Sequence, residues 1–347
     1  YRTCEQYDKK RMAETKRIRK AVPMMFEIPI TEFKNLKIGN MENIDAGTGC
    51  TVFLFEKGAP AGLDVRGGGP ASEESELLKP MAAAEKIHAI VLSGGSAFGL
   101  EVSNGVREYL EERDIGFDVG VTKVPLVCQS CLFDLSVGDE RIRPDKKMGY
   151  CACENAEVFN YQDGNYGAGT GATVGKLKGM DFCMKSGIGS YAVKSGALMA
   201  GAVVAVNSLG DVYDWKTGQK VAGLLAENKR SFGDSEMELL NINEVMDNKF
   251  VGNTTIAVFF TNARFDKTKL GKIAGMAHDG YARSIRPVHT TADGDSIYAV
   301  SLGEVNADLD VVGTLAARVI SEAIIRAVEH ADSAYGYPAT RELLTKK

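Results

Sequence analysis

Residues 253–262 read Asn-Thr-Thr-Ile-Ala-Val-Phe-Phe-Thr-Asn, and this stretch decides how the rest of the chain is interpreted. β-branched and aromatic residues dominate it, so we expect a buried strand that begins at Thr254. The preceding segment, 231–248, is rich in acidic residues and poor in strand formers. Such a composition is that of an ordinary surface loop, and also that of the solvated segment that a self-cleaving precursor needs before its cleavage point.

Apolar runs elsewhere predict further strands, at residues 50–55, 87–92, 127–135, 197–207 and 296–301. Helical spacing of apolar residues predicts three helices: one that begins near residue 100, one at 267–278 and one at 310–330. Alternating strands and helices define the α/β class. Because no repeat or low-complexity linker interrupts this pattern, we expect one domain over residues 44–347, preceded by an N-terminal arm of residues 1–43.

Composition and charge exclude several classes of function. The 347 residues are 44% hydrophobic and 25% charged, and the net charge is −5, so a nucleic-acid partner is not expected. The longest apolar run falls far short of the ~20 residues that span a bilayer, so no membrane partner is expected either. Because the seven cysteines are scattered and no apolar leader segment is visible in the sequence, we expect a reducing cytoplasm.

Thr254 is the first candidate for chemistry. A threonine hydroxyl is a weak nucleophile until a base removes its proton. If the Asn253–Thr254 bond is cut, the freed α-amine, with an unperturbed pKa of about 7.7–8.0, supplies that base. The alternative is that Thr254 merely starts a strand, as β-branched residues commonly do.

Asp293 and Asp295 flank Gly294 between two apolar segments. Two carboxylates at this spacing can turn toward one point and orient a hydroxyl or hold an ammonium group. The alternatives are a hairpin turn and a calcium-binding loop, and the ligand spacing of the calcium loop is absent.

Lys176 follows a glycine-rich stretch at 167–175, which lacks the spacing of a nucleotide-binding loop. Asn207 ends an apolar strand. Asparagine at a strand end is commonly a turn former, although its amide could also donate a hydrogen bond to an oxyanion.

The cysteines and histidines offer competing interpretations. Two close pairs, Cys128/Cys131 and Cys151/Cys153, are spaced as in some zinc sites, yet free cysteine in a buried strand is a small hydrophobe. The first pair lies in a predicted strand, so no metal is expected. His88 is expected to be a hydrogen-bonded core residue. His289 lies close enough in sequence to Asp293 to touch the candidate site.

These segments in this order resemble the self-processing N-terminal-nucleophile hydrolases that include D-aminopeptidases, β-peptidyl aminopeptidases and nylon-oligomer (6-aminohexanoate-oligomer) endohydrolases. The resemblance covers residues 44–331 and rests on five motifs. They are Asp64-Val65-Arg66-Gly67-Gly68, Ser93–Glu101 (SGGSAFGLE), Arg143-Pro144-Asp145, Gly252–Thr255 (GNTT) and Asp293–Asp295 (DGD). The chain is most similar to the nylon-oligomer branch, which cleaves between Asn and Thr.

The resemblance implies roles for the candidate residues. Thr254 would be the nucleophile, released by cleavage after Asn253, and the fragments would be 1–253 and 254–347. Asp293 and Asp295 would position Thr254, and Lys176 would assist. The oxyanion donor would be Asn207.

The resemblance also implies how the substrate is bound. Ser96 and Phe133 would contact it, although the nylon-oligomer branch carries Tyr at the position of Phe133, so one hydroxyl is missing. The aminopeptidase branch has an acidic residue before its aromatic-Asp pair. Here Ser130-Cys131-Leu132 precedes Phe133-Asp134 and supplies no carboxylate.

The implied fold is a four-layer αββα sandwich of the D-aminopeptidase/ornithine acetyltransferase type, assembled as a homotetramer. The implied activity is hydrolysis of small linear amides or peptides without a cofactor. Three alternatives stay open: an aminopeptidase for D- or β-amino-acid peptides, an acyltransferase like the ornithine acetyltransferases, and a metal- or ligand-binding protein built on the cysteine pairs.

Overall fold

Two mixed β-sheets form the centre of the molecule. The computed structural model describes residues 25–242 and 252–345. The first sheet has six strands in the order β1-β12-β13-β16-β18-β4. Its strands are β1 (Phe26–Glu27), β12 (Ile188–Ser195), β13 (Leu198–Asn207), β16 (Thr254–Ala263), β18 (Ser296–Val305) and β4 (Ala61–Val65). Within it, β16 runs antiparallel to β13 and parallel to β18.

The second sheet has five strands in the order β2-β3-β6-β9-β5. These are β2 (Lys37–Asn43), β3 (Thr48–Ala59), β6 (Ile87–Ser93), β9 (Val127–Cys131) and β5 (Ala71–Glu73). Of the pairs in this sheet, β6 and β9 are parallel and the others antiparallel.

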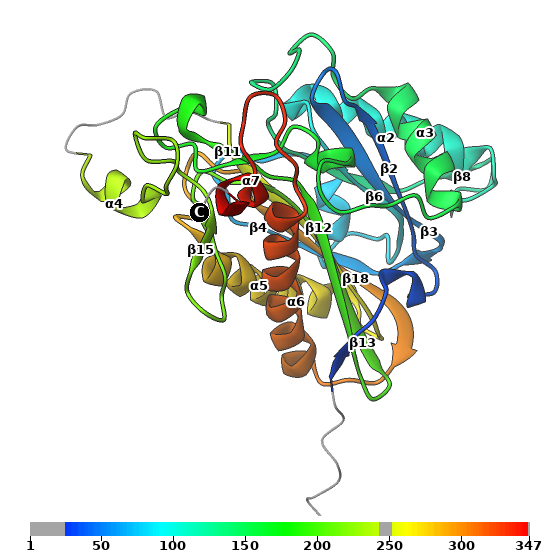
Figure 1. Ribbon diagram of the computed structural model, residues 1–347. Helices are drawn as coiled ribbons and strands as arrows, with labels where there is room; N and C mark the ends of the chain where they lie inside the picture. The colour runs from blue at the N-terminus through cyan, green and yellow to red at the C-terminus, as the bar shows by residue number, and fades with distance from the viewer. Residues whose placement is uncertain (1–24, 243–251, 346–347) are drawn as a thin grey trace, which may run out of the picture.

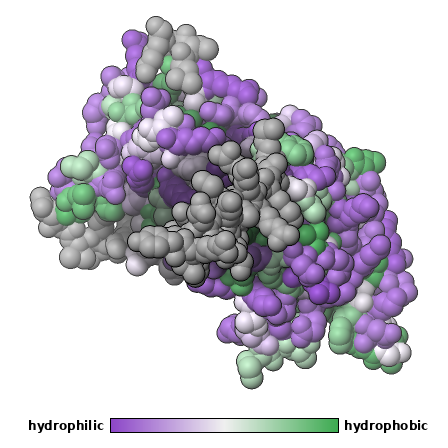
Figure 2. All heavy atoms as spheres, turned by 90° about the horizontal axis from the view of Figure 1, so that it is seen from below, coloured by the Kyte–Doolittle hydropathy of each residue, from purple (hydrophilic) through white to green (hydrophobic). Residues whose placement is uncertain are grey.

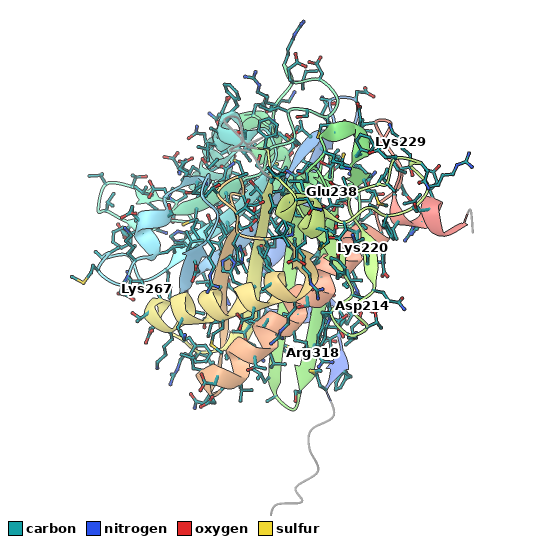
Figure 3. All side chains as sticks on the ribbon, turned by 90° about the vertical axis from the view of Figure 1, so that its left-hand side faces the viewer. Asp214, Lys220, Lys229, Glu238, Lys267 and Arg318 are labelled. Atoms are coloured by element: carbon teal, nitrogen blue, oxygen red, sulfur yellow. The ribbon has the colours of Figure 1, made fainter. Side chains whose placement is uncertain are left out.

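Helices cover the outer face of each sheet (Figure 1). The helices α5 (Lys267–Ser284) and α6 (Leu309–Glu329) pack on the six-stranded sheet, and α2 (Val102–Glu111) and α3 (Lys146–Glu157) pack on the five-stranded one. In Figure 3, α5 and α6 run side by side across their sheet. The carboxylate of Asp308 caps α6 by accepting from the amides of Asp310 and Val311, as expected for a helix N-cap.

Three apolar cores separate the four layers. One lies between the sheets, one between α5/α6 and the six-stranded sheet, and one between α2/α3 and the five-stranded sheet. The order of layers is therefore helix, sheet, sheet, helix, which confirms the expected four-layer αββα sandwich.

Short elements complete the fold. They are β7 (Phe117–Asp118), β8 (Lys123–Val124), β10 (Thr173–Val174), β11 (Met184–Lys185), β14 (Asp211–Tyr213), β15 (Lys220–Ala222), β17 (Ile285–Arg286), α4 (Ser235–Leu240), α7 (Thr340–Thr345) and the 3-10 helices η1 (Ile30–Glu32), η2 (Ser75–Leu78), η3 (Ser96–Glu101), η4 (Gly167–Gly169) and η5 (Met180–Phe182).

Two sequence predictions need correction. The arm predicted over residues 1–43 is shorter, because residues 26–43 supply β1 to one sheet and β2 to the other; residues 1–24 lie outside the described part. The strand predicted over 127–135 ends at Cys131, after which the chain turns at Asp134.

Segment 231–248 contains the short helix α4, and its residues from 243 onward are not described.

One face of the molecule is shown in Figure 2. On the face turned to the viewer in Figure 2, hydrophobic residues form small separate patches among hydrophilic ones, which is the normal appearance of a protein surface. Of the helices described, none combines the length and apolar character that crossing a membrane requires.

Candidate active site

Sheet topology brings two sequence-distant segments to the start of β16. Asn207, the last residue of β13, pairs directly with Thr254, because those two strands are antiparallel. The strand β18 runs parallel to β16, so the Asp293–Asp295 loop that precedes it lies at the same sheet edge. Asn253 itself forms a parallel bridge with Asp293. Thr254 is buried, with 4% of its surface exposed.

The bond before Thr254 is held in a defined environment. The Thr254 hydroxyl donates to its own preceding carbonyl, Asn253 O, at 2.5 Å. The same oxygen accepts the Gly294 N–H at 2.9 Å. A Cβ at Gly294 would lie 2.7 Å from Thr254 Oγ1, so only glycine permits this approach.

Lys176 and Asn207 form a buried pair beside this bond. Lys176 Nζ donates to Asn207 Oδ1 at 2.8 Å, to Asn207 O at 2.9 Å and to Gly252 O at 2.9 Å. Three oxygen acceptors match the three N–H groups of an ammonium ion. Burial lowers the pKa of Lys176 to about 7, so its proton becomes exchangeable near neutral pH.

The Asn207 amide is oriented by its neighbours on both sides. Its Oδ1 accepts the Thr173 N–H at 3.0 Å, which directs Nδ2 the other way. Nδ2 donates to Phe133 O at 2.7 Å and to Gly252 O at 3.3 Å. Two donors, Asn207 Nδ2 and Lys176 Nζ, therefore share one acceptor. It is the carbonyl oxygen of Gly252, the residue before Asn253.

The two carboxylates have different partners. Asp295 Oδ1 accepts the Thr255 N–H at 2.8 Å. Asp293 Oδ2 accepts the Thr290 N–H at 2.7 Å and the Thr290 hydroxyl at 2.6 Å. Burial, together with the nearby charge of Asp295, raises the pKa of Asp293 to about 6. Asp293 thus changes charge within the physiological range.

The glycines after Asp64 explain one of the sequence motifs. Gly67 crosses the Asp293–Asp295 loop so closely that a Cβ would lie 2.3 Å from Asp295 N. Gly69 N–H donates to Asp293 O at 2.8 Å. This stretch therefore fixes the backbone of the acidic loop.

Phe133 and Ser96 lie at the margin of this cluster. Phe133 reaches it through its carbonyl, which accepts from Asn207. Ser96 is one step further away, since its N–H donates to Leu132 O at 2.9 Å. Asp134 ties the two segments together by accepting the Gly95 N–H and the Thr48 hydroxyl, each at 2.7 Å.

Sequence reasoning missed Gly294 as a donor and Thr290 as a partner of Asp293, and it placed His289 near the site only by sequence distance. The position of Thr290, three residues before Asp293, was the sequence signal that could have indicated the contact between these two residues. For the Gly294 amide no side chain gives a signal, because the donor is backbone. His88 is a satisfied core residue as predicted, since its Nδ1 accepts the Leu126 N–H at 3.1 Å.

The cysteine pairs face different parts of the interior. Cys128 belongs to the core between the sheets, whereas Cys153 belongs to the core under α2 and α3. Burial raises the pKa of Cys128 to about 12, so its thiol stays protonated. Across residues 25–242 and 252–345, no three His, Cys, Asp or Glu side chains are grouped so that they could hold a metal ion.

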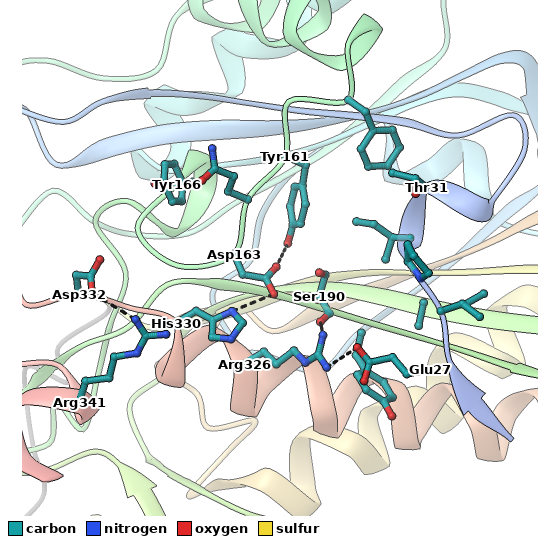
Figure 4. Close-up of a pocket in the computed structure, with 17 residues that line it drawn as sticks. Glu27, Thr31, Tyr161, Asp163, Tyr166, Ser190, Arg326, His330, Asp332 and Arg341 are labelled. Atoms are coloured by element: carbon teal, nitrogen blue, oxygen red, sulfur yellow. Dashed lines mark hydrogen bonds and ion pairs between the residues drawn. The ribbon is translucent and has the colours of Figure 1, made fainter.

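A surface cavity of about 890 Å³ lies elsewhere, between β1, β12 and the end of α6 (Figure 4). Its ionisable side chains pair with one another: Arg326 with Glu27 at 2.6 Å, His330 with Asp163 at 3.4 Å and Arg341 with Asp332 at 3.7 Å. None of the candidate catalytic residues lines it.

Known proteins resemble this chain in sequence and in fold. The chain matches Peptidase family S58 over residues 29–341. An uncharacterised aminopeptidase of Mycobacterium leprae (strain TN) is 35% identical over 339 residues, which cover 89% of this chain and 92% of the relative. A 6-aminohexanoate-oligomer endohydrolase of Kocuria sp. (strain KY2) is 27% identical over 317 residues, covering 86% and 85%.

A solved structure shares the fold. The L-aminopeptidase D-Ala-esterase/amidase of Ochrobactrum anthropi, described as a variant of the Ntn hydrolase fold, has a TM-score of 0.68 at 17% identity, covering 91% of this chain and 93% of that one. Fold and relatives together define the class: this is a hydrolase of amide or peptide bonds. The chain belongs to peptidase family S58.

Proposed function

We propose that this chain is a self-processing N-terminal-threonine amide hydrolase that cuts itself between Asn253 and Thr254. The observation that carries the proposal is the placement of the Thr254 hydroxyl 2.5 Å from Asn253 O, with the Gly294 N–H 2.9 Å from the same oxygen. A nucleophile and an oxyanion donor therefore both lie at one peptide bond.

In self-cleavage, Thr254 Oγ1 adds to the Asn253 carbonyl carbon, and a carboxylate such as Asp293 takes its proton. Negative charge develops on Asn253 O, where the Gly294 amide stabilises it. The C–N bond then breaks, the nitrogen takes a proton, and an ester joins Asn253 to the Thr254 side chain. Water hydrolyses this ester, which leaves a free amine on Thr254 and the fragments 1–253 and 254–347.

In turnover, the new α-amine of Thr254 acts as the base for its own hydroxyl. Departure of residues 252 and 253 from their present positions would free Lys176 Nζ and Asn207 Nδ2, which now donate to Gly252 O. We assign them to the substrate carbonyl, with Asn207 as oxyanion donor. Asp293 and Asp295 hold the amine and the backbone of Thr254 and Thr255.

An endohydrolase acting on linear amide oligomers is the mode that the site supports best. The donors beside Thr254, Lys176 Nζ and Asn207 Nδ2, suit a carbonyl oxygen. The segment before Phe133 also supplies no carboxylate that could grip a substrate ammonium group. The alternative is an aminopeptidase, the activity named for the relative that is 35% identical.

Two matched substrates distinguish these modes. We expect a linear 6-aminohexanoate oligomer and its N-acetylated form to be hydrolysed at comparable rates, measured by chromatography of the products. Cleavage that occurs only when the amine is free would contradict the endohydrolase mode and support an aminopeptidase. A Phe133→Tyr variant, assayed alongside, reports whether the missing hydroxyl limits activity on this substrate.

The pH dependence of self-cleavage follows from Asp293. Its raised pKa of about 6 means that the carboxyl group is neutral below that pH and ionised above it. Because only the ionised form accepts a proton, the rate should rise as the pH increases from about 5 to about 7. An Asp293→Asn variant should be slow at every pH, and a wild-type rate that does not change over this range would contradict the assignment.

The homotetramer implied by the family resemblance is also a proposal. Light scattering coupled to size-exclusion chromatography measures the assembly mass directly and would give about four times 37.3 kDa for a tetramer. Cleavage before Thr254 leaves that total mass unchanged, because β16 stays hydrogen-bonded between β13 and β18.

A further inference from the structure

The carboxylate of Asp295 has a second partner besides the main chain of β16. Oδ2 of Asp295 accepts the His289 N–H at 3.2 Å and lies 2.8 Å from His289 Nδ1; because a carboxylate can only accept, we assign the ring proton to Nδ1. Its Oδ1 accepts the Thr255 N–H at 2.8 Å. One buried carboxylate thus joins His289 to the residue that directly follows Thr254.

His289 is held in an unusual backbone conformation. Its φ is +58°, which lies in the left-handed region that L-residues other than Asn, Asp and His seldom adopt. This conformation directs both its N–H and its ring nitrogen to the same oxygen of Asp295.

A second histidine supports the first. The ring of His278, on α5, lies 4.7 Å from the ring of His289 in an edge-to-face contact. His278 Nε2 lies 3.1 Å from Asp64 O, and a carbonyl can only accept, so Nε2 carries the proton. Burial lowers the pKa of His278 to about 4, which keeps this ring neutral at neutral pH.

Tyr281 completes the support from the other side. Its ring stacks on His289 at 5.8 Å, and its hydroxyl donates to Thr255 O at 3.2 Å. The N–H of Thr255 is therefore fixed by Asp295 and its carbonyl by Tyr281, and both of these residues contact His289.

We infer that His289 is a positioning residue of the active site, which holds Asp295 so that Asp295 fixes the start of β16 and the Thr254 nucleophile with it. His278 and Tyr281 keep the His289 ring in place. This inference rests on the proposed role of Thr254 and adds to it a side chain that does not touch the reacting bond. A donor at the position of His289 Nδ1 is the property that matters.

Two substitutions at position 289 distinguish the effect of the side-chain N–H donor from the effect of the backbone conformation. His289→Gly tolerates φ of +58° and removes the ring, whereas His289→Asn tolerates the same φ and keeps an N–H donor. We expect His289→Gly to slow self-cleavage and to lower kcat of the processed enzyme about 10- to 100-fold, the effect of one charge-assisted hydrogen bond, with KM little changed. The rate of His289→Asn should lie closer to wild type, and added imidazole should restore part of the rate of His289→Gly.

Lys229→Gly is the matched control, because Lys229 is an exposed residue with φ of +52° (Figure 3). If His289→Gly cleaves itself and turns over as fast as wild type, the positioning role is wrong. The positioning role is also wrong if His289→Gly is slow and if neither the His289→Asn substitution nor added imidazole gives a faster rate than His289→Gly alone. If wild type shows no self-cleavage at all, the proposed function fails instead, which keeps the two failures distinct.

Discussion

A Thr254→Ala variant is expected to remain a single chain of 37.3 kDa, while the wild type separates under denaturing conditions into fragments of about 27 and about 10 kDa, corresponding to residues 1–253 and 254–347. The alanine has no hydroxyl to attack the Asn253 carbonyl, so self-cleavage should slow by roughly 10⁴-fold or more. Intact mass spectrometry measures both outcomes directly.

Two further variants test whether the hydroxyl of Thr254 is the group that self-cleavage requires. Thr254→Ser keeps a hydroxyl and should still cleave. Thr261→Ala removes a threonine hydroxyl from the other end of β16, where it donates to Met199 O at 2.8 Å, and should cleave at the wild-type site. An uncut wild-type chain that is fully folded would remove the free α-amine, and with it the catalytic proposal.

A Gly294→Ala variant is expected to fold and to lose most self-cleavage. The added Cβ would lie 2.7 Å from Thr254 Oγ1 and 3.0 Å from Gly69 O, so either the nucleophile or the acidic loop must move. Movement of the loop also withdraws the Gly294 N–H from Asn253 O. Loss of one oxyanion donor costs about 10²- to 10³-fold in rate, and a time course on denaturing gels measures it.

Gly271→Ala is the control for the second prediction. Gly271 lies in α5, where an added Cβ would meet no atom within 4 Å, and alanine favours a helix more than glycine does. The melting temperature of each variant shows whether it is folded. Cleavage of Gly294→Ala at the wild-type rate would mean that neither the glycine nor its amide matters at this bond.

Local sequence patterns predicted most of the secondary structure. The strands β3, β6, β13, β16 and β18 and the helices α2, α5 and α6 lie where apolar periodicity placed them. They are long or strongly apolar, so local preference and burial agree. The two misplaced boundaries lie in segments whose pairing is set by distant residues. The segment 26–43 contains β1 and β2, which gain their partners from β12 and β3, and β9 ends at Cys131, where its pairing with β6 and β5 ends.

The candidate residues could be selected by chemical type, and the sequence alone determined that Thr254, two carboxylates, a lysine and an asparagine were available. Their convergence was decided by tertiary structure. Asn207 meets Thr254 because β13 and β16 are antiparallel in one register, and Asp293 meets Asn253 because β18 is parallel to β16. A donor such as the Gly294 amide, or a ring held as His289 is, has no sequence signature, since backbone direction and register exist only after the sheet has formed.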